Sequence, residues 1–135
     1  KNLYDYYKNV TYISDKTSSI RQLSVYENIK IWKKIFLSDV SYKQIENILS
    51  ILNIKIYLDT KVNSLSLGEI KKLELLRLII ENKKIWILDE PFTNLDIESI
   101  EMISQTFMDH SNNNGCIIFS SHQKPQVELS EEINL

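Results

Sequence analysis

The stretch IWILDEPFTNLD, residues 85–96, decides the fold of this chain. Residues 85–88 form a continuous apolar run directly behind Lys83 and Lys84, and this pattern predicts a strand over residues 84–88 that is buried on both faces. The strand ends in Asp89 and Glu90, and Pro91 ends its pairing and fixes the turn. Parallel strands bring the side chains at their carboxyl ends to the sheet edge where nucleotides and metals bind. The run therefore predicts two carboxylates at such an edge.

Strands and helices alternate on both sides of this stretch. Residues 10–14 and 116–119 have strand-like composition, and the second of these is predicted to be buried. Asp96 can cap a helix whose apolar residues recur at helical spacing, and the Asn-rich residues 112–115 predict a turn. This order predicts right-handed parallel crossovers and the α/β class. A last short strand is expected at residues 132–135.

Three serines stand where helices are expected to begin. Ser24, Ser41 and Ser66 are each followed, three residues later, by Glu or Gln, which is the capping-box pattern. A helical apolar face follows each serine. The helical stretch from about residue 25 to residue 63 is therefore predicted to be an insertion into the α/β layer.

The composition limits the possible classes of protein. A length of 135 residues with 43% hydrophobic and 25% charged residues fits one compact domain. The net charge of −2 provides no basic field for nucleic acid. The one cysteine, Cys116, excludes a disulfide within the chain and is expected to be a buried structural thiol. No apolar run is long enough to span a bilayer.

Five residues fit nucleotide chemistry. Asp89 at a strand end suits Mg²⁺, which takes few protein carboxylates when it is bound with triphosphate. Glu90 can orient or deprotonate an attacking water. His122, behind the strand at residues 116–119, can contact a γ-phosphate. The helix that Ser66 opens presents backbone amides to an anion, and Gly68 allows phosphate to approach closely.

Several candidate residues also have a structural interpretation. Asp89 and Glu90 can be two surface acids at a strand end. Ser66 and Glu69 can form only a capping box, although a cap is compatible with a phosphate site. Asp96 can be an N-cap, an inter-subunit contact beside a nucleotide, or both. His110, on a polar helix end, is expected to be only structural.

Taken together, the motifs resemble the ATP-binding cassette (ABC) superfamily. The signature loop corresponds to residues 65–69, the Walker B strand to residues 85–90, the D-loop to residues 94–96 and the switch histidine to His122. The resemblance implies a P-loop NTPase fold with a parallel sheet core (1–16), a helical subdomain with the signature loop (17–68) and the rest of the core (69–135). It implies ATP and Mg²⁺ as cofactors, and ATP hydrolysis across an interface with a second ATP-binding subunit.

The resemblance also implies residue roles. Glu90 and His122 correspond to the catalytic residues and Asp89 to the metal ligand. The positions that correspond to nucleotide-contacting residues are Ser66, Gly68, Glu69, Asp96 and Lys16.

Within the superfamily, residues 85–96, 26–29 and 120–123 are similar to the branch that exports haem for cytochrome c maturation. That branch implies a peripheral protein bound to an integral-membrane transporter subunit, with no nucleic-acid partner. It would lie on the cytoplasmic face of the bacterial inner membrane or the matrix face of the mitochondrial inner membrane.

The sequence departs from the family pattern in three places. It contains no Gly-x-x-x-x-Gly-Lys-Ser/Thr loop, which the family places upstream of residue 1, so truncation is expected. Lys16 stands where the family carries the Q-loop glutamine. Leu67 replaces a signature glycine, and Glu69 replaces a glutamine. These changes leave open a degenerate partner subunit that hydrolyses little ATP, or the ATPase of another ABC exporter. A soluble ABC ATPase of translation or DNA maintenance is disfavoured by the mild acidity.

Overall fold

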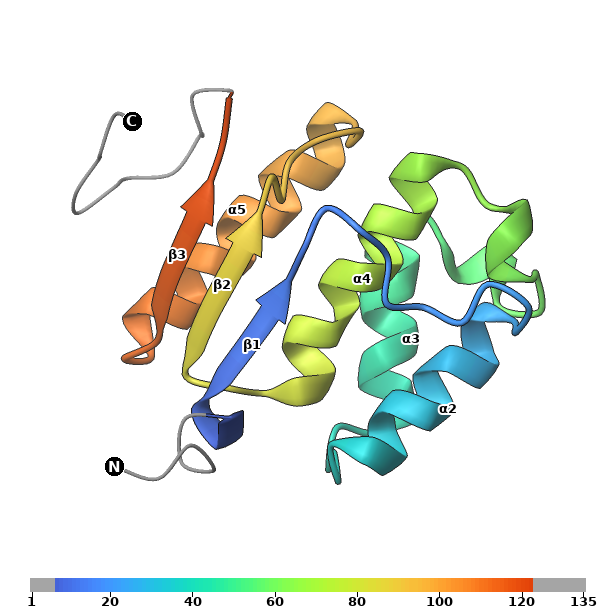
Figure 1. The fold of residues 1–135 in the computed structure, drawn as a ribbon, viewed down its shortest axis with the longest axis horizontal. Coiled ribbons are helices and arrows are strands. Elements are labelled where there is room, and N and C mark those ends of the chain that lie inside the picture. Colours follow the sequence, from blue (N-terminus) through green and yellow to red (C-terminus); the bar gives the residue numbers. More distant parts are fainter. Residues whose placement is uncertain (1–6, 123–135) are drawn as a thin grey trace.

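A three-stranded parallel sheet forms the centre of the computed structural model, which describes residues 7–122 (Figure 1). The strands are β1 (Val10–Ile13), β2 (Ile85–Asp89) and β3 (Cys116–Ser120), in the order β1-β2-β3. Their register places Ile13 beside Leu88, and Leu88 beside Phe119. The parallel pairing confirms the predicted α/β class. The strand expected at residues 132–135 lies outside the described residues.

Helices make both connections between the strands. The chain passes from β1 to β2 through α2 (Val25–Ile35), α3 (Tyr42–Ile51), the 3₁₀ turns η1 (Lys55–Tyr57) and η2 (Val62–Ser64), and α4 (Leu67–Glu81). It returns from β2 to β3 through α5 (Ile97–Asn112). Figure 1 shows α2 and α3 on the far side of α4 from the sheet. The inserted helices therefore lie beside the α/β layer, beyond α4.

The predicted helix starts are confirmed. Ser24, Ser41 and Ser66 each accept a hydrogen bond from the backbone N–H three residues later, and the side chain of that residue returns to the backbone N–H of the serine. Asp96 caps α5 by accepting a hydrogen bond from the backbone N–H of Ser99. These contacts lie within four residues of sequence, so the pattern alone could predict them.

Two groups of buried apolar side chains hold the elements together. One group joins α2, α3 and α4 and contains Val25, Leu49 and Leu73. The other joins one face of the sheet to α4 and α5 and contains Trp86 and Phe107. Helix α4 contributes to both groups, so it ties the inserted helices to the sheet.

The burial of β2 and β3 differs from the prediction. Trp86 and Leu88 of β2 are buried, but the residues that alternate with them are half-buried, so only one face of this strand is fully covered. Strand β3 alternates between exposed and half-buried residues, and the Cys116 thiol is exposed. The predictions of two doubly buried strands and a buried thiol are therefore wrong for this structure. The physical reason is that, among the described residues, α4 and α5 pack on one face of the sheet only.

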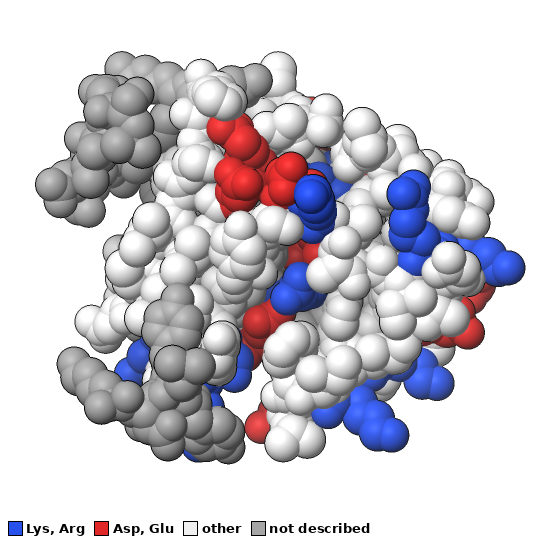
Figure 2. All heavy atoms as spheres, in the orientation of Figure 1, with Lys and Arg blue, Asp and Glu red and all other residues white. Residues whose placement is uncertain are grey.

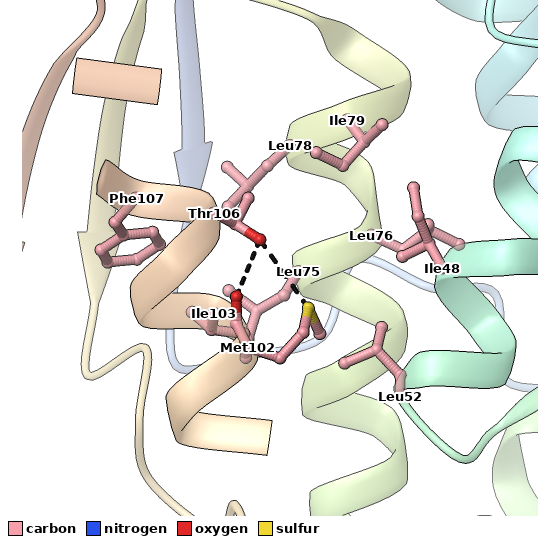
Figure 3. A pocket seen from close by; sticks show the side chains of 10 residues that line it. All are labelled: Ile48, Leu52, Leu75, Leu76, Leu78, Ile79, Met102, Ile103, Thr106 and Phe107. Carbon is pink, nitrogen blue, oxygen red and sulfur yellow. Dashed lines mark hydrogen bonds between the residues drawn. The ribbon is translucent and has the colours of Figure 1, made fainter. Parts of the chain in front are cut away.

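A small apolar cavity lies where α3, α4 and α5 meet (Figure 3). Its volume is about 20 Å³, and Leu75, Leu78 and Ile103 are among the side chains that line it. Thr106 satisfies its own hydroxyl by donating to the carbonyl of Met102 at 2.9 Å. A space of this size holds at most about one water molecule, so it is a packing defect rather than a ligand site.

Candidate functional site

A cleft of about 400 Å³ opens beside the carboxyl ends of β1 and β2. In the space-filling view, acidic side chains gather above these strand ends, with basic side chains next to them (Figure 2). The cleft is lined by residues 14–17, Arg21, Leu67, Ile70, Lys71, Glu74, Glu90, Thr93, Asn94 and His122. The strand-end loops and one side of α4 therefore form its walls.

Ser120, at the end of β3, connects the two carboxylate residues of β2. Its hydroxyl donates to Oδ1 of Asp89 at 2.7 Å and accepts the backbone N–H of Glu90 at 3.1 Å. The register pairs Asp89 directly with Ser120. No local sequence motif marks Ser120 as a site residue, because its hydroxyl acts from the neighbouring strand.

Glu90 has an unusual backbone conformation. Its φ of 46° lies in the left-handed region, which a glutamate rarely adopts without support from its surroundings. Its Oε2 accepts the hydroxyl of Thr93 at 3.1 Å, and its Oε1 lies 3.6 Å from Nε2 of His122. The Glu90 side chain is 21% exposed, whereas that of His122 is 97% exposed. The structure therefore brings together the carboxylate and the imidazole that the sequence predicted as a catalytic pair.

Lys71 lines the cleft and lies close to several carboxylates. Its ammonium donates to the backbone carbonyl of Asp89 at 3.3 Å, and only 9% of the residue is exposed. Burial lowers the pKa of Lys71, and the nearby negative charges of Asp89, Asp15, Glu74 and Glu90 oppose this effect. A fixed positive charge thus offsets part of the repulsion among these carboxylates.

At the start of α4, the predicted site residues Ser66 and Glu69 form hydrogen bonds with each other. The Ser66 hydroxyl accepts the backbone N–H of Glu69 at 3.2 Å, and Oε2 of Glu69 accepts the backbone N–H of Ser66 at 2.7 Å. Burial alone would raise the pKa of Glu69, but hydrogen bonds from Ser66 and Tyr57 lower it on balance. The Glu69 carboxylate is therefore engaged in the cap.

Gly68 has a packing role that the sequence did not indicate. A Cβ added at this position would lie 2.5 Å from the backbone carbonyl oxygen of Asn94. The first turn of α4 therefore contacts the loop at residues 94–96 directly. Leu67, which stands beside Gly68, is 69% exposed and lines the cleft.

Asp96 connects the starts of α4 and α5. Its Oδ2 lies 2.8 Å from Nζ of Lys72, while its Oδ1 caps α5. The Lys72 side chain is 8% exposed and that of Asp96 is 57% exposed. The hydrogen bonds from Lys72 and Ser99 lower the pKa of Asp96 to about 2. The structure thus gives Asp96 a role within its own chain and leaves its predicted contact with nucleotide untested.

Lys16 is exposed and lines the cleft, two residues after Ser14. The Ser14 hydroxyl donates to the backbone carbonyl of Lys16 at 3.0 Å, which turns the chain directly after β1. The structure therefore places Lys16 with Glu90 and His122 in one cleft. Its predicted contact with nucleotide remains a prediction.

The fit of a divalent metal depends on the donors available. Among residues 7–122, no group of three or more His, Cys, Asp or Glu side chains is arranged to hold a metal ion by itself. Mg²⁺ bound with a triphosphate keeps several waters and needs only one or two carboxylates. Asp89, with one carboxylate oxygen engaged by Ser120, meets that smaller requirement.

The sequence profile of ABC transporters matches residues 1–93, which is more than half of the chain. The chain belongs to the ABC transporter family. A solved structure titled "Structure of ATP binding subunit of ABC transporter" superposes with a TM-score of 0.78 at 19% identity. It covers 90% of this chain and 53% of the other. The fold is therefore the ABC ATPase form of the P-loop NTPase fold, of which this chain carries a part.

Two curated ABC relatives carry the same name. The cytochrome c biogenesis ATP-binding export protein CcmA of Histophilus somni is 33% identical over all 135 residues, which correspond to 62% of that protein. The CcmA protein of Reclinomonas americana is 31% identical over 121 residues, covering 87% of this chain and 54% of that protein. This ABC chain thus spans about three-fifths of the length of the first of these relatives and less of the second. Within the described part of the chain, no helix combines the length and the apolar character needed to cross a bilayer.

Proposed function

We propose that this chain is part of an ATP-hydrolysing subunit of an ABC exporter that serves cytochrome c biogenesis, with haem as the exported cargo. The observation that carries the proposal is the approach of His122 to Glu90, 3.6 Å apart beside a cleft at the end of the Asp89-bearing strand. The family match and the shared name of the relatives support it.

In the proposed mechanism, each residue acts on ATP or on the attacking water. Asp89 would hold Mg²⁺ through water, and the metal would offset phosphate charge. Glu90 would accept the proton of the attacking water, and His122 would hold the γ-phosphate. General-base catalysis typically contributes about 10²–10⁴-fold to the rate. Ser66 and Gly68 would close on a nucleotide held by the partner subunit.

The partners follow from that mechanism. An integral-membrane transporter subunit would be driven by the closure, and a second ATP-binding subunit would complete each site. Such a protein would be peripheral, on the cytoplasmic face of a bacterial inner membrane or on the matrix face of a mitochondrial one.

Replacing the proposed base tests the function. Glu90→Gln, in the full-length protein with its membrane partner, is expected to lower ATP turnover about 100-fold or more, because the amide cannot accept the proton. Phosphate release measured under saturating ATP is the readout. Glu101→Gln is the matched control, since Glu101 is exposed on α5 and does not line the cleft. Turnover of Glu90→Gln close to that of the wild type would remove Glu90 from the reaction.

A degenerate partner subunit is the second candidate, and three departures from the family pattern favour it. Lys16 and the exposed Leu67 line the cleft, and Glu69 places a carboxylate in the first turn of α4. A bulky side chain and a negative charge near the phosphates oppose tight nucleotide closure. The two candidates differ in one measurement: a full-length wild-type complex that binds ATP but releases no phosphate would establish the degenerate subunit.

A further inference from the structure

Among the described residues, Glu74 is the buried acid whose carboxylate accepts the most hydrogen bonds. The proposed mechanism does not use it. Glu74 lies on α4 and is 3% exposed. Its Oε1 accepts the backbone N–H groups of Ser18 and Ser19 at 3.0 and 2.8 Å, and the Thr17 hydroxyl at 2.6 Å. The Ser19 hydroxyl also donates to Oε1. We call residues 17–19 the serine turn.

The second carboxylate oxygen is also satisfied. Oε2 of Glu74 accepts the Ser18 hydroxyl at 2.8 Å and a guanidinium N–H of Arg77 at 3.2 Å. Successive backbone N–H groups that converge on one oxygen form the kind of concavity that binds anions in proteins. Burial would raise the pKa of Glu74, but the hydrogen bonds from the serine turn and the charge of Arg77 lower it on balance. The serine turn is therefore an anion site that the chain fills with its own carboxylate.

A second glutamate on the same helix makes contacts of a different kind. Glu81 is 7% exposed and accepts Nε of Arg77 at 2.9 Å, as well as the Thr11 hydroxyl of β1 at 2.9 Å. Glu74 and Glu81 thus share Arg77 and a buried setting on α4. Only Glu74 reaches the segment between β1 and α2, so the molecule contains its own matched control.

The serine turn lies directly next to the cleft. Residues 14–17 line the cleft and include Lys16, and the other side of the turn is fixed by Asn28, whose Oδ1 accepts the backbone N–H of Ile20 at 2.7 Å. Helix α4 begins beside Ser66 and Gly68 and carries Glu74 less than two turns further on. One carboxylate therefore joins two walls of the cleft.

We propose that Glu74 is a positioning residue that fixes the cleft wall of residues 14–17 to α4. This inference rests on the proposed function, because it places that wall against the bound nucleotide. With Glu74 in place, the wall and the first turn of α4 keep one relative position. Without the carboxylate, the serine turn loses its common acceptor, and the wall that carries Lys16 loosens.

Hydrogen exchange of the full-length protein tests the contact without requiring ATP hydrolysis. In Glu74→Gln, the backbone amides of Ser18 and Ser19 are expected to exchange about tenfold faster, because one charged acceptor now presents an NH₂ group to its donors. In Glu81→Gln these amides should stay within about twofold of the wild type. Should Glu74→Gln fail to fold, Ser18→Ala removes one donor at an exposed residue and is expected to increase exchange at Ser19.

Steady-state kinetics separate positioning from general loosening of the fold. Glu74→Gln should lower kcat about tenfold or more, with KM for MgATP within about twofold, because the wall acts after the nucleotide has bound. Glu81→Gln should change neither kcat nor KM, even if it lowers the thermal stability as much as Glu74→Gln does. Equal kinetic effects of the two substitutions, or unchanged exchange at residues 18 and 19 in Glu74→Gln, would overturn the proposal. A wild type without turnover would refute the proposed function, while the exchange comparison would still decide the role of Glu74.

Discussion

Gly68 shows that a glycine can be required by a contact rather than by its backbone conformation. Its φ is not positive, and it lies in the first turn of α4, where alanine is the better helix former. The carbonyl oxygen of Asn94 occupies the space that a Cβ would need. The close approach of the first turn of α4 to the loop at residues 94–96 thus overrides local helix propensity at this position.

The substitution Gly68→Ala is expected to lower the free energy of unfolding, although helix propensity alone predicts a gain of about 0.5–1 kcal/mol. The 2.5 Å contact with a backbone oxygen can be relieved only if α4 or the loop at residues 94–96 moves. Chemical denaturation of Gly68→Ala and of a control variant, each compared with the wild type, measures the difference in the free energy of unfolding. Leu67→Ala, at the neighbouring exposed position, should be nearly neutral. A Gly68→Ala protein as stable as the wild type would show that the first turn of α4 and the loop at residues 94–96 separate freely.

At the level of elements, His110 connects the end of α5 to β2. Its ring stacks on Trp86 with 3.6 Å between ring centroids and an angle of 8° between the planes. Its Nε2 lies 3.1 Å from the backbone carbonyl of Lys84 and donates to it in the tautomer protonated at that nitrogen. A Cβ at Gly115 would overlap this ring, so the glycine in the turn before β3 makes room for the stack. The structural role expected for His110 is therefore to hold the end of α5 against β2 through this stack and this hydrogen bond.

Burial lowers the pKa of His110 below its usual 6.5, although the hydrogen bond to Lys84 opposes the shift. Below pH 6.5 the unfolded chain takes up a proton that the folded protein resists, so the stability contributed by neutral His110 is lost as the pH falls. We expect the free energy of unfolding to drop more steeply between pH 7.5 and pH 5.5 in the wild type than in His110→Phe, which keeps an aromatic ring but does not titrate. Urea unfolding over this range is the measurement. Identical slopes would show that His110 titrates alike in both states.

On the scale of the whole molecule, the cleft combines residues from both sides of the inserted helices. Residues 14–17 precede the insertion, whereas Glu90 and His122 follow it. The parallel register brings the ends of β1, β2 and β3 to one edge. The cleft is therefore a product of topology, and no single segment contains it.

The 135 residues alone are expected to bind ATP weakly, because their sequence contains no glycine-rich lysine loop to hold the phosphates. Isothermal titration with MgATP should give a dissociation constant well above the micromolar range. The full-length protein under the same conditions is the comparison. Micromolar binding by the 135 residues would mean that the cleft holds triphosphate without such a loop.

Contacts between residues close in sequence could be predicted, as could the parallel pairing of the strands, but the burial and bonding of individual side chains by distant segments could not. The capping serines and Asp96 were predictable because the donor and the acceptor lie within four residues. Burial of Cys116 was predicted wrongly, because an apolar run does not reveal whether anything packs on its second face. Glu74 was missed for a related reason: its partners in the serine turn lie 55 to 57 residues away, and no spacing rule connects them.

The sequence by itself determined the alternation of strands and helices, the helix starts and the order of the family motifs, because short-range periodicity and capping specify these features. Only the tertiary structure decided which face of the sheet is covered, how close His122 lies to Glu90, why Gly68 must be glycine, and where the Glu74 carboxylate finds its donors. The physical reason is that burial and hydrogen bonding between distant segments depend on packing in three dimensions, which residues adjacent in the chain do not encode.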